Sequence, residues 1–204
     1  MEHNFFVGRE AELAALHQAY RKAQTGVMQI AFVNGEAGTG KTALVNQFLS
    51  QVSADPAGAP AIVTVRCTLE SENRGYLPFI SAIRDLYDLE IQTENMKRSR
   101  QESLQRSLKI IKELAPVWLD LLLFDLPTKV VKTWEVLSPY LKKKTLDAPV
   151  FSQKSVFDQF YQLILAKTQS LPVIIFLDDL QWMDRSSLGL LLYFSQNPPS
   201  CPLY

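Results

Sequence analysis

A glycine-rich stretch followed by a lysine and a threonine has the clearest chemistry in this 204-residue sequence. Its residues fit the pattern G-x-x-x-x-G-K-[ST], and they are Gly35, Glu36, Ala37, Gly38, Thr39, Gly40, Lys41 and Thr42. In this pattern the glycines allow a turn whose backbone N–H groups point inward and bind a phosphate. The lysine reaches the β- and γ-phosphates of a nucleotide, and the threonine hydroxyl is a ligand of Mg²⁺. The stretch therefore predicts a phosphate-binding loop, for which the alternative is a glycine-rich turn that binds nothing.

A phosphate-binding loop of this kind needs a strand before it and a helix after it. The apolar residues at positions 30–33 predict the strand, and the spacing of the apolar residues at positions 44–49 predicts one face of a helix. The positive end of that helix, near Lys41, would add to the attraction for phosphate. Both flanking segments thus favour nucleotide binding over an inert turn.

Two consecutive carboxylates follow an apolar run, 173–177, that is typical of a strand buried on both faces. A buried carboxylate is costly unless it is paired or bound to a metal, and the Mg²⁺ of a nucleotide would provide that partner. We therefore expect Asp178 to be a metal ligand, together with Thr42. Asp179 is expected to orient or deprotonate the attacking water, which makes it and Lys41 the candidate catalytic residues. The alternative, that these aspartates cap the next helix, suits Asp184 better.

The other segments alternate between helical and extended patterns. Helices are expected at residues 9–24, 78–89, 103–114, 151–170 and 186–196, a second strand at 61–67, and a polar loop at 68–77. Residues 91–150 are expected to form a helical insertion, with Trp118 and Trp134 in the core. The order of elements predicts a three-layer α/β/α fold with a mostly parallel sheet, the fold class of the P-loop NTPases.

The composition excludes several other classes of protein. Hydrophobic residues make up 47% of the chain, which is enough for one large globular domain. Basic and acidic residues balance at 21 each, so there is no overall positive field for nucleic acid. The two cysteines, Cys67 and Cys201, are too few for a disulfide framework and fit a reducing compartment. Without a secretory signal or a long apolar run, we expect a cytoplasmic protein with no nucleic-acid or membrane site.

Three segments in the expected order resemble a known family. They are FFVGREAEL at 5–13, GEAGTGKT at 35–42 and FLDDLQWMD at 176–184, and GYLPF at 75–79 is also similar. Together they resemble the AAA-like (NACHT/AAA-type) ATPase module of STAND proteins, the signal-transduction ATPases with numerous domains. The resemblance implies a switch in which ADP holds a closed form and ATP, with an inducer, allows oligomerisation.

The same resemblance implies an adenine-binding role for residues near the amino terminus. These residues are Phe6, Val7, Gly8 and Arg9. From physical chemistry alone, residues 5–7 would instead be an apolar plug at the edge of the sheet.

In the family that the chain resembles, the strand with the first sensor residue lies between the phosphate-loop strand and the strand that ends in the Walker B aspartate. Residues 201–204 are expected to begin that strand, so the sheet is expected to be incomplete. We therefore expect 1–204 to be a truncated AAA-like domain, with 1–90 and 151–204 carrying the Walker A and Walker B halves on either side of the insertion. The effector and sensor domains would then belong to a longer parent chain.

The expected function is an ATP/ADP-binding P-loop ATPase module, with Mg²⁺, that regulates an attached effector in a signalling or transcription-regulating protein. Hydrolysis is expected of the full-length parent, and the fragment is expected at least to bind nucleotide. One alternative is a small-molecule phosphotransferase. By analogy with the family, the Asp178–Asp179 pair favours water as the phosphate acceptor over a small molecule. An interaction scaffold with a vestigial nucleotide site is another, against which the intact Lys41, Thr42 and Asp178 argue.

Overall fold

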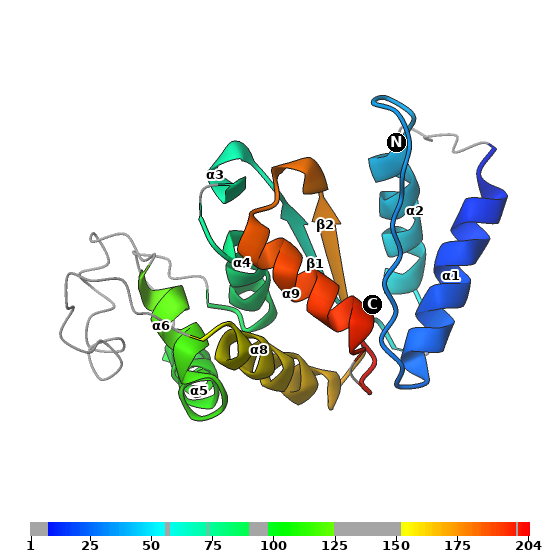
Figure 1. Cartoon of the computed structure of the whole chain (residues 1–204). Coiled ribbons are helices and arrows are strands. Elements are labelled where there is room, and N and C mark those ends of the chain that lie inside the picture. Colours follow the sequence, from blue (N-terminus) through cyan, green and yellow to red (C-terminus); the bar gives the residue numbers. More distant parts are fainter. Residues whose placement is uncertain (1–7, 56–57, 73, 90–97, 125–151, 199) are drawn as a thin grey trace.

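The computed structural model describes residues 8–55, 58–72, 74–89, 98–124, 152–198 and 200–204 (Figure 1). In chain order the described elements are α1 (Glu10–Gln24), α2 (Lys41–Ser53), β1 (Ala61–Arg66), α3 (Leu69–Glu72), α4 (Leu77–Leu86), α5 (Arg98–Leu114), α6 (Pro116–Phe124), α8 (Gln153–Thr168), β2 (Val173–Asp178), the 3-10 turn η2 (Leu180–Trp182) and α9 (Arg185–Gln196). None of the described helices is long and apolar enough to cross a membrane.

The sheet consists of β1 and β2, which run parallel. Both strands are rich in β-branched residues, which fit a pleated buried surface. The register pairs Ala61 with Val173 at one end and Arg66 with Asp178 at the other. Because parallel strands end at the same edge, this register brings Arg66 beside the two aspartates that follow β2.

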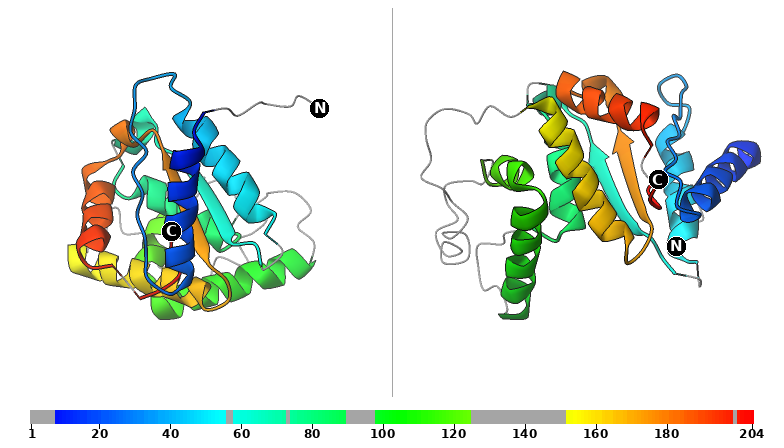
Figure 2. Two further views of the ribbon diagram at one scale, coloured as in Figure 1. Left: turned by 90° about the vertical axis from the view of Figure 1, so that its right-hand side faces the viewer. Right: turned by 60° about the horizontal axis from the view of Figure 1, so that its bottom comes forward.

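The two faces of the sheet pack against different helices. One face contributes Ile174 to a small core that it shares with α1 and α2. The small core consists of Leu16, Tyr20, Leu44, Val45, Phe48, Leu49, Val52 and Ile174. The other face contributes Val63, Val65 and Val173 to a large core that it shares with α4, α5, α6, α8 and α9. Figure 2 shows α1 and α2 together, apart from the larger group of helices, so the sheet lies between two helical layers as the sequence predicted.

The expected strand before the phosphate loop is not formed. Residues 27–36 have no regular secondary structure, and Phe32 is 59% exposed. A strand requires ladder partners, and among the described residues the backbone of 27–35 makes one backbone–backbone hydrogen bond to another segment, from the Gln29 N–H to the Leu203 carbonyl (3.1 Å). The expected polar loop at 68–77 also differs, because it contains the short helix α3.

The expected helical insertion is partly described. Helices α5 and α6 pack against α8 and α4, and Trp118 is fully buried in the large core. Residues 90–97 and 125–151, with Trp134 among them, lie outside the described residues.

Residues 202–204 lie between β2 and Gln29. The Val173 N–H donates to the Pro202 carbonyl (2.9 Å), and the Ile175 N–H donates to the Tyr204 carbonyl (2.7 Å). Leu203 forms a parallel bridge with Val173 and accepts the bond from Gln29 on its other side. This is the position in the sheet that the sequence analysis expected for these residues.

Candidate nucleotide-binding site

The loop at residues 35–42 has the backbone geometry that its glycines predict. Gly38 and Gly40 have φ angles of 79° and 78°, in the left-handed region that side chains disfavour. A β-carbon at Gly35 would lie 2.9 Å from the Thr39 hydroxyl oxygen, so the Thr39 side chain would have to move to make room for it. Helix α2 begins at Lys41, so its first N–H groups, which have no partner within the helix, lie at this loop.

The Lys41 side chain folds over the phosphate loop. Its Nζ donates hydrogen bonds to the carbonyl oxygens of Gly35 (2.9 Å) and Glu36 (2.8 Å). The ammonium group therefore lies at the centre of the loop, where a positive charge is useful for binding a phosphate.

A hydroxyl and a carboxylate meet next to the loop. The Thr42 Oγ1 lies 3.2 Å from Oδ2 of Asp178 and 3.4 Å from its Oδ1, although the two residues are far apart in the sequence. Magnesium prefers oxygen ligands, and in nucleotide sites it is bound by one or two protein groups together with substrate phosphates. Thr42 and Asp178 therefore fit a metal ion that a nucleotide would bring, and their role as metal ligands stays a prediction.

The Asp179 side chain accepts hydrogen bonds from two neighbouring side chains. Its Oδ2 accepts a hydrogen bond from Nε of Arg66 (2.7 Å), and its Oδ1 accepts one from Nε2 of Gln181 (3.1 Å). The bond from Arg66, then that from Gln181, hold the pKa of this carboxyl below its usual value. Asp179 is thus a charged carboxylate in an ion pair, and such a group is a weaker base than a free one. Its expected role toward water stays a prediction.

Arg66 is a site residue that sequence reasoning missed. It ends β1, more than 100 residues before Asp179 in the chain, so no local pattern marks it. The parallel register, which pairs Arg66 with Asp178, brings it to the site.

The residues expected to contact adenine are only partly described. Val7 and Phe6 lie outside the described residues. Gly8 is exposed and has a φ of 91°. Nη2 of Arg9 donates a hydrogen bond to the Thr39 carbonyl, so this side chain contacts the phosphate loop directly. The adenine role of Val7, Gly8 and Arg9 remains a prediction.

Asp184 caps α9, as the sequence predicted. It is buried, and its carboxylate accepts hydrogen bonds from the Ser187 N–H (2.8 Å), the Ser187 hydroxyl (2.5 Å) and the Tyr76 N–H (3.2 Å). These contacts join the start of α9 to the turn before α4 and support the segment that carries Asp178 and Asp179.

Cys67, at the end of β1, is a buried free thiol, and burial raises its pKa to about 11.

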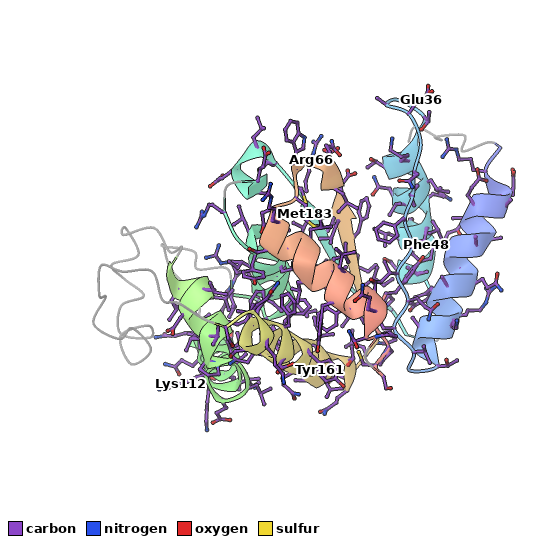
Figure 3. The ribbon with its side chains drawn as sticks, in the orientation of Figure 1. Glu36, Phe48, Arg66, Lys112, Tyr161 and Met183 are labelled. Carbon is purple, nitrogen blue, oxygen red and sulfur yellow. The ribbon has the colours of Figure 1, made fainter. Side chains whose placement is uncertain are left out.

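A cavity of about 900 Å³ opens at this site. At one end its lining includes Gly40, Lys41 and Thr42 from the loop and Asp178 from β2. Figure 3 labels Glu36 at the tip of the phosphate loop and Arg66 at the end of β1. The space is large enough for a nucleotide, because ligand pockets commonly measure roughly 300–1,000 Å³.

The loop, the helix that follows it and the aspartate at the end of a buried strand define a P-loop nucleotide-binding domain of the α/β class. The family model for the AAA ATPase domain matches residues 6–204, so this chain belongs to that family. No curated protein and no solved structure gives a match to the chain.

Proposed function

We propose that this chain binds ATP and ADP together with Mg²⁺ and acts as the nucleotide-dependent switch of a STAND-type protein. The single observation that carries the nucleotide site is the contact between Thr42 and Asp178 beside a loop closed around Lys41. In this proposal Lys41 neutralises the β- and γ-phosphates, and Thr42 and Asp178 bind the metal.

The chemical step is hydrolysis of ATP to ADP and phosphate. Mg²⁺, when bound, supplies charge stabilisation at the phosphates. Asp179 acts on the attacking water. To do so, its carboxylate must either leave the ion pair with Arg66 or contact the water while it keeps that pair. Arg9, through Thr39, positions the loop.

The regulatory part of the proposal rests on the resemblance of residues 5–13 and 176–184 to STAND ATPases. In the cytoplasm, the module would control an effector domain of the same parent protein and assemble with other copies when ATP is bound. The two buried free thiols are compatible with such a reducing compartment.

The test is equilibrium binding of a fluorescent ADP analogue to the 204-residue chain with Mg²⁺, with ATP and GTP as competitors. Lys41→Ala should weaken binding by about 100-fold, because it removes charge-assisted hydrogen bonds to phosphate. Lys22→Ala, the same substitution in the last turn of α1, is the matched control and should leave binding unchanged. Equal affinities for Lys41→Ala and the unmodified chain would contradict the assignment.

Two further measurements separate metal binding from chemistry. Asp178→Asn should reduce the dependence of ATP binding on Mg²⁺ and leave metal-free binding in place. Release of phosphate from ATP without any added acceptor would support hydrolysis. Release that requires a small hydroxyl compound, which then carries the phosphate, would support a phosphotransferase instead.

A further inference from the structure

The turn after β2 brings a further polar side chain, that of Gln181, to the carboxylates of the site. Asp179 has a φ of 57°, in the left-handed region, so β2 ends before it and the chain turns into η2. The Trp182 N–H donates to the Asp179 carbonyl (3.0 Å), which closes the turn. Figure 1 shows this turn and the phosphate loop at the same end of β2. The turn therefore holds the backbone of Gln181 at the end of the sheet where the nucleotide site lies.

A continuous series of hydrogen bonds connects Gln181 to the expected metal ligands. Nε2 of Gln181 donates to Oδ1 of Asp179 (3.1 Å), and the Asp179 N–H donates to Oδ1 of Asp178 (3.0 Å). Asp178 in turn accepts a hydrogen bond from the Thr42 hydroxyl. Gln181 is exposed, and it lines the same cavity as Lys41 and Asp178. Its side chain can therefore meet a molecule that is bound in that cavity.

The Gln181 amide has an acceptor that the turn does not use. A carboxylate only accepts hydrogen bonds, so the amide donor faces Asp179 and the carbonyl oxygen, Oε1, is left for another partner. No group among the described residues donates to Oε1. Each oxygen of Asp179 accepts one hydrogen bond from a side chain and keeps a second lone pair. Two acceptors that can take a proton from water thus lie on two side chains in direct contact.

A pair of acceptors of this kind suits the water that attacks a phosphate. When such a water donates one hydrogen bond to each acceptor, its lone pairs are directed away from both of them. Enzymes that transfer phosphoryl groups work mainly by positioning and by electrostatic stabilisation, and a residue that orients the water is a recurring part of their sites.

We propose that Gln181 is a second catalytic residue for ATP hydrolysis, which accepts a hydrogen bond from the attacking water at Oε1 while Asp179 accepts the other. This inference rests on the proposed function. The water oxygen forms a bond to the γ-phosphorus, and the bond from that phosphorus to the β–γ bridging oxygen breaks, with its electron pair leaving on ADP. A proton of the water passes to the Asp179 carboxylate. Gln181 exchanges no proton and acts by orientation alone.

The alternative is that Gln181 only holds Asp179 in place, and the two roles predict different changes in rate. Gln181→Met keeps the length of the side chain and removes both polar atoms. The pKa of Asp179 should then rise, because the bond from Gln181 helps to lower it. A holding residue would therefore leave a more basic carboxylate and no fall in rate. A water ligand should instead lower kcat for phosphate release by about tenfold or more, with KM unchanged.

The experiment compares the 204-residue chain with Gln181→Met and with Gln162→Met. Gln162 is exposed on α8 outside the cavity lining, so its variant is the matched control and should change neither kcat nor affinity. A second measurement needs no turnover and uses ADP, Mg²⁺ and aluminium fluoride, which together mimic the phosphoryl group during transfer. Aluminium fluoride should strengthen ADP binding to the unmodified chain, and Gln181→Met should lose about tenfold of that gain while its affinity for ADP alone stays the same.

Two results would overturn the proposal. One is a gain from aluminium fluoride that is the same in Gln181→Met and in the unmodified chain, including no gain in either. The other is a fall in kcat of the same size in Gln181→Met and in Arg66→Ala, since each variant removes one hydrogen bond from Asp179 and Gln181 would then act only through that carboxylate. Because ADP binding is measured separately in every protein, either result leaves the assignment of the nucleotide site intact.

Discussion

The two apolar cores on either side of the sheet differ in size and in how their polar atoms are satisfied. In the large core, Trp118 donates through Nε1 to the Val156 carbonyl (2.8 Å), and the Tyr87 hydroxyl donates to the Leu163 carbonyl (2.8 Å). Beside the small core, the Tyr204 hydroxyl is buried with no hydrogen-bond partner among the described residues, and burial raises its pKa to about 12. The large core therefore combines burial with satisfied hydrogen bonds, and the small core does not.

The nucleotide site is assembled from both sides of this division. Lys41 and Thr42 begin α2, which packs in the small core, whereas Asp178 ends β2, which lies between the two cores, and Asp179 follows it. The Thr42–Asp178 contact joins them. We therefore expect global stability to depend mainly on the large core, and the affinity for nucleotide to depend on how the small core positions α2.

The largest effect is expected from Trp118→Ala. The substitution removes a fully buried indole and leaves the Val156 carbonyl without this donor, which should lower the free energy of unfolding by about 5 kcal/mol. Denaturant unfolding measures this change, and Trp118→Phe should cost less. The ADP affinity of the protein that remains folded should not change, and a parallel loss of affinity would show that the two cores do not act separately.

A smaller loss of stability but a larger loss of binding is expected from Phe48→Ala. The Phe48 ring is buried against His17, Tyr20 and Tyr204, with ring centroids 5.1–6.1 Å apart. Its removal should lower the free energy of unfolding by about 3 kcal/mol. Because the space left by the missing Phe48 ring loosens the packing of α2, the affinity for ADP should fall as well. Titration with ADP under conditions where the variant is folded measures this affinity. Phe48→Leu is the matched control, with a smaller effect on both quantities.

These cores also show what the sequence could and could not predict. The phosphate loop, α2, β2 and the Asp184 cap were predicted correctly because each depends on residues close together in the chain. The prediction of a strand at positions 30–33 was wrong, because apolar residues favour a strand only where another strand bonds to it. The contacts of Arg66 with Asp179 and of Arg9 with Thr39 depend on strand register and helix placement, which no local pattern contains.

Removing a single hydroxyl should have opposite effects in the two cores. Tyr87→Phe removes the bond to the Leu163 carbonyl and should lower the free energy of unfolding by about 1 kcal/mol. Tyr204→Phe removes a buried hydroxyl that lacks a partner, so it should leave stability unchanged or raise it by about 1 kcal/mol. Thermal and denaturant unfolding of the pair measures the contrast. Equal losses for both variants would mean that the Tyr204 hydroxyl is satisfied in solution.

The smallest effect on stability is expected at the site itself, from Arg66→Ala. The Arg66–Asp179 pair is exposed to solvent, so its loss should not measurably change the free energy of unfolding. Arg66 is nevertheless the main cause of the lowered pKa of Asp179. Without it, the pKa of this carboxyl should rise toward its usual value, and a carbon-13 NMR titration of the Asp179 carboxyl measures that rise.

A matched variant separates the charge of Arg66 from its geometry. Arg66→Lys keeps the positive charge but loses the Nε donor, so the pKa of Asp179 should fall between those of the original chain and Arg66→Ala. If Asp179 acts on the attacking water, release from Arg66 also frees a more basic carboxylate, and phosphate release from ATP by Arg66→Ala should not fall below that of the unmodified chain. A pKa of Asp179 that is the same in all three proteins would mean that the ion pair does not persist in solution, and the carboxylate would then already be free to face the phosphate loop.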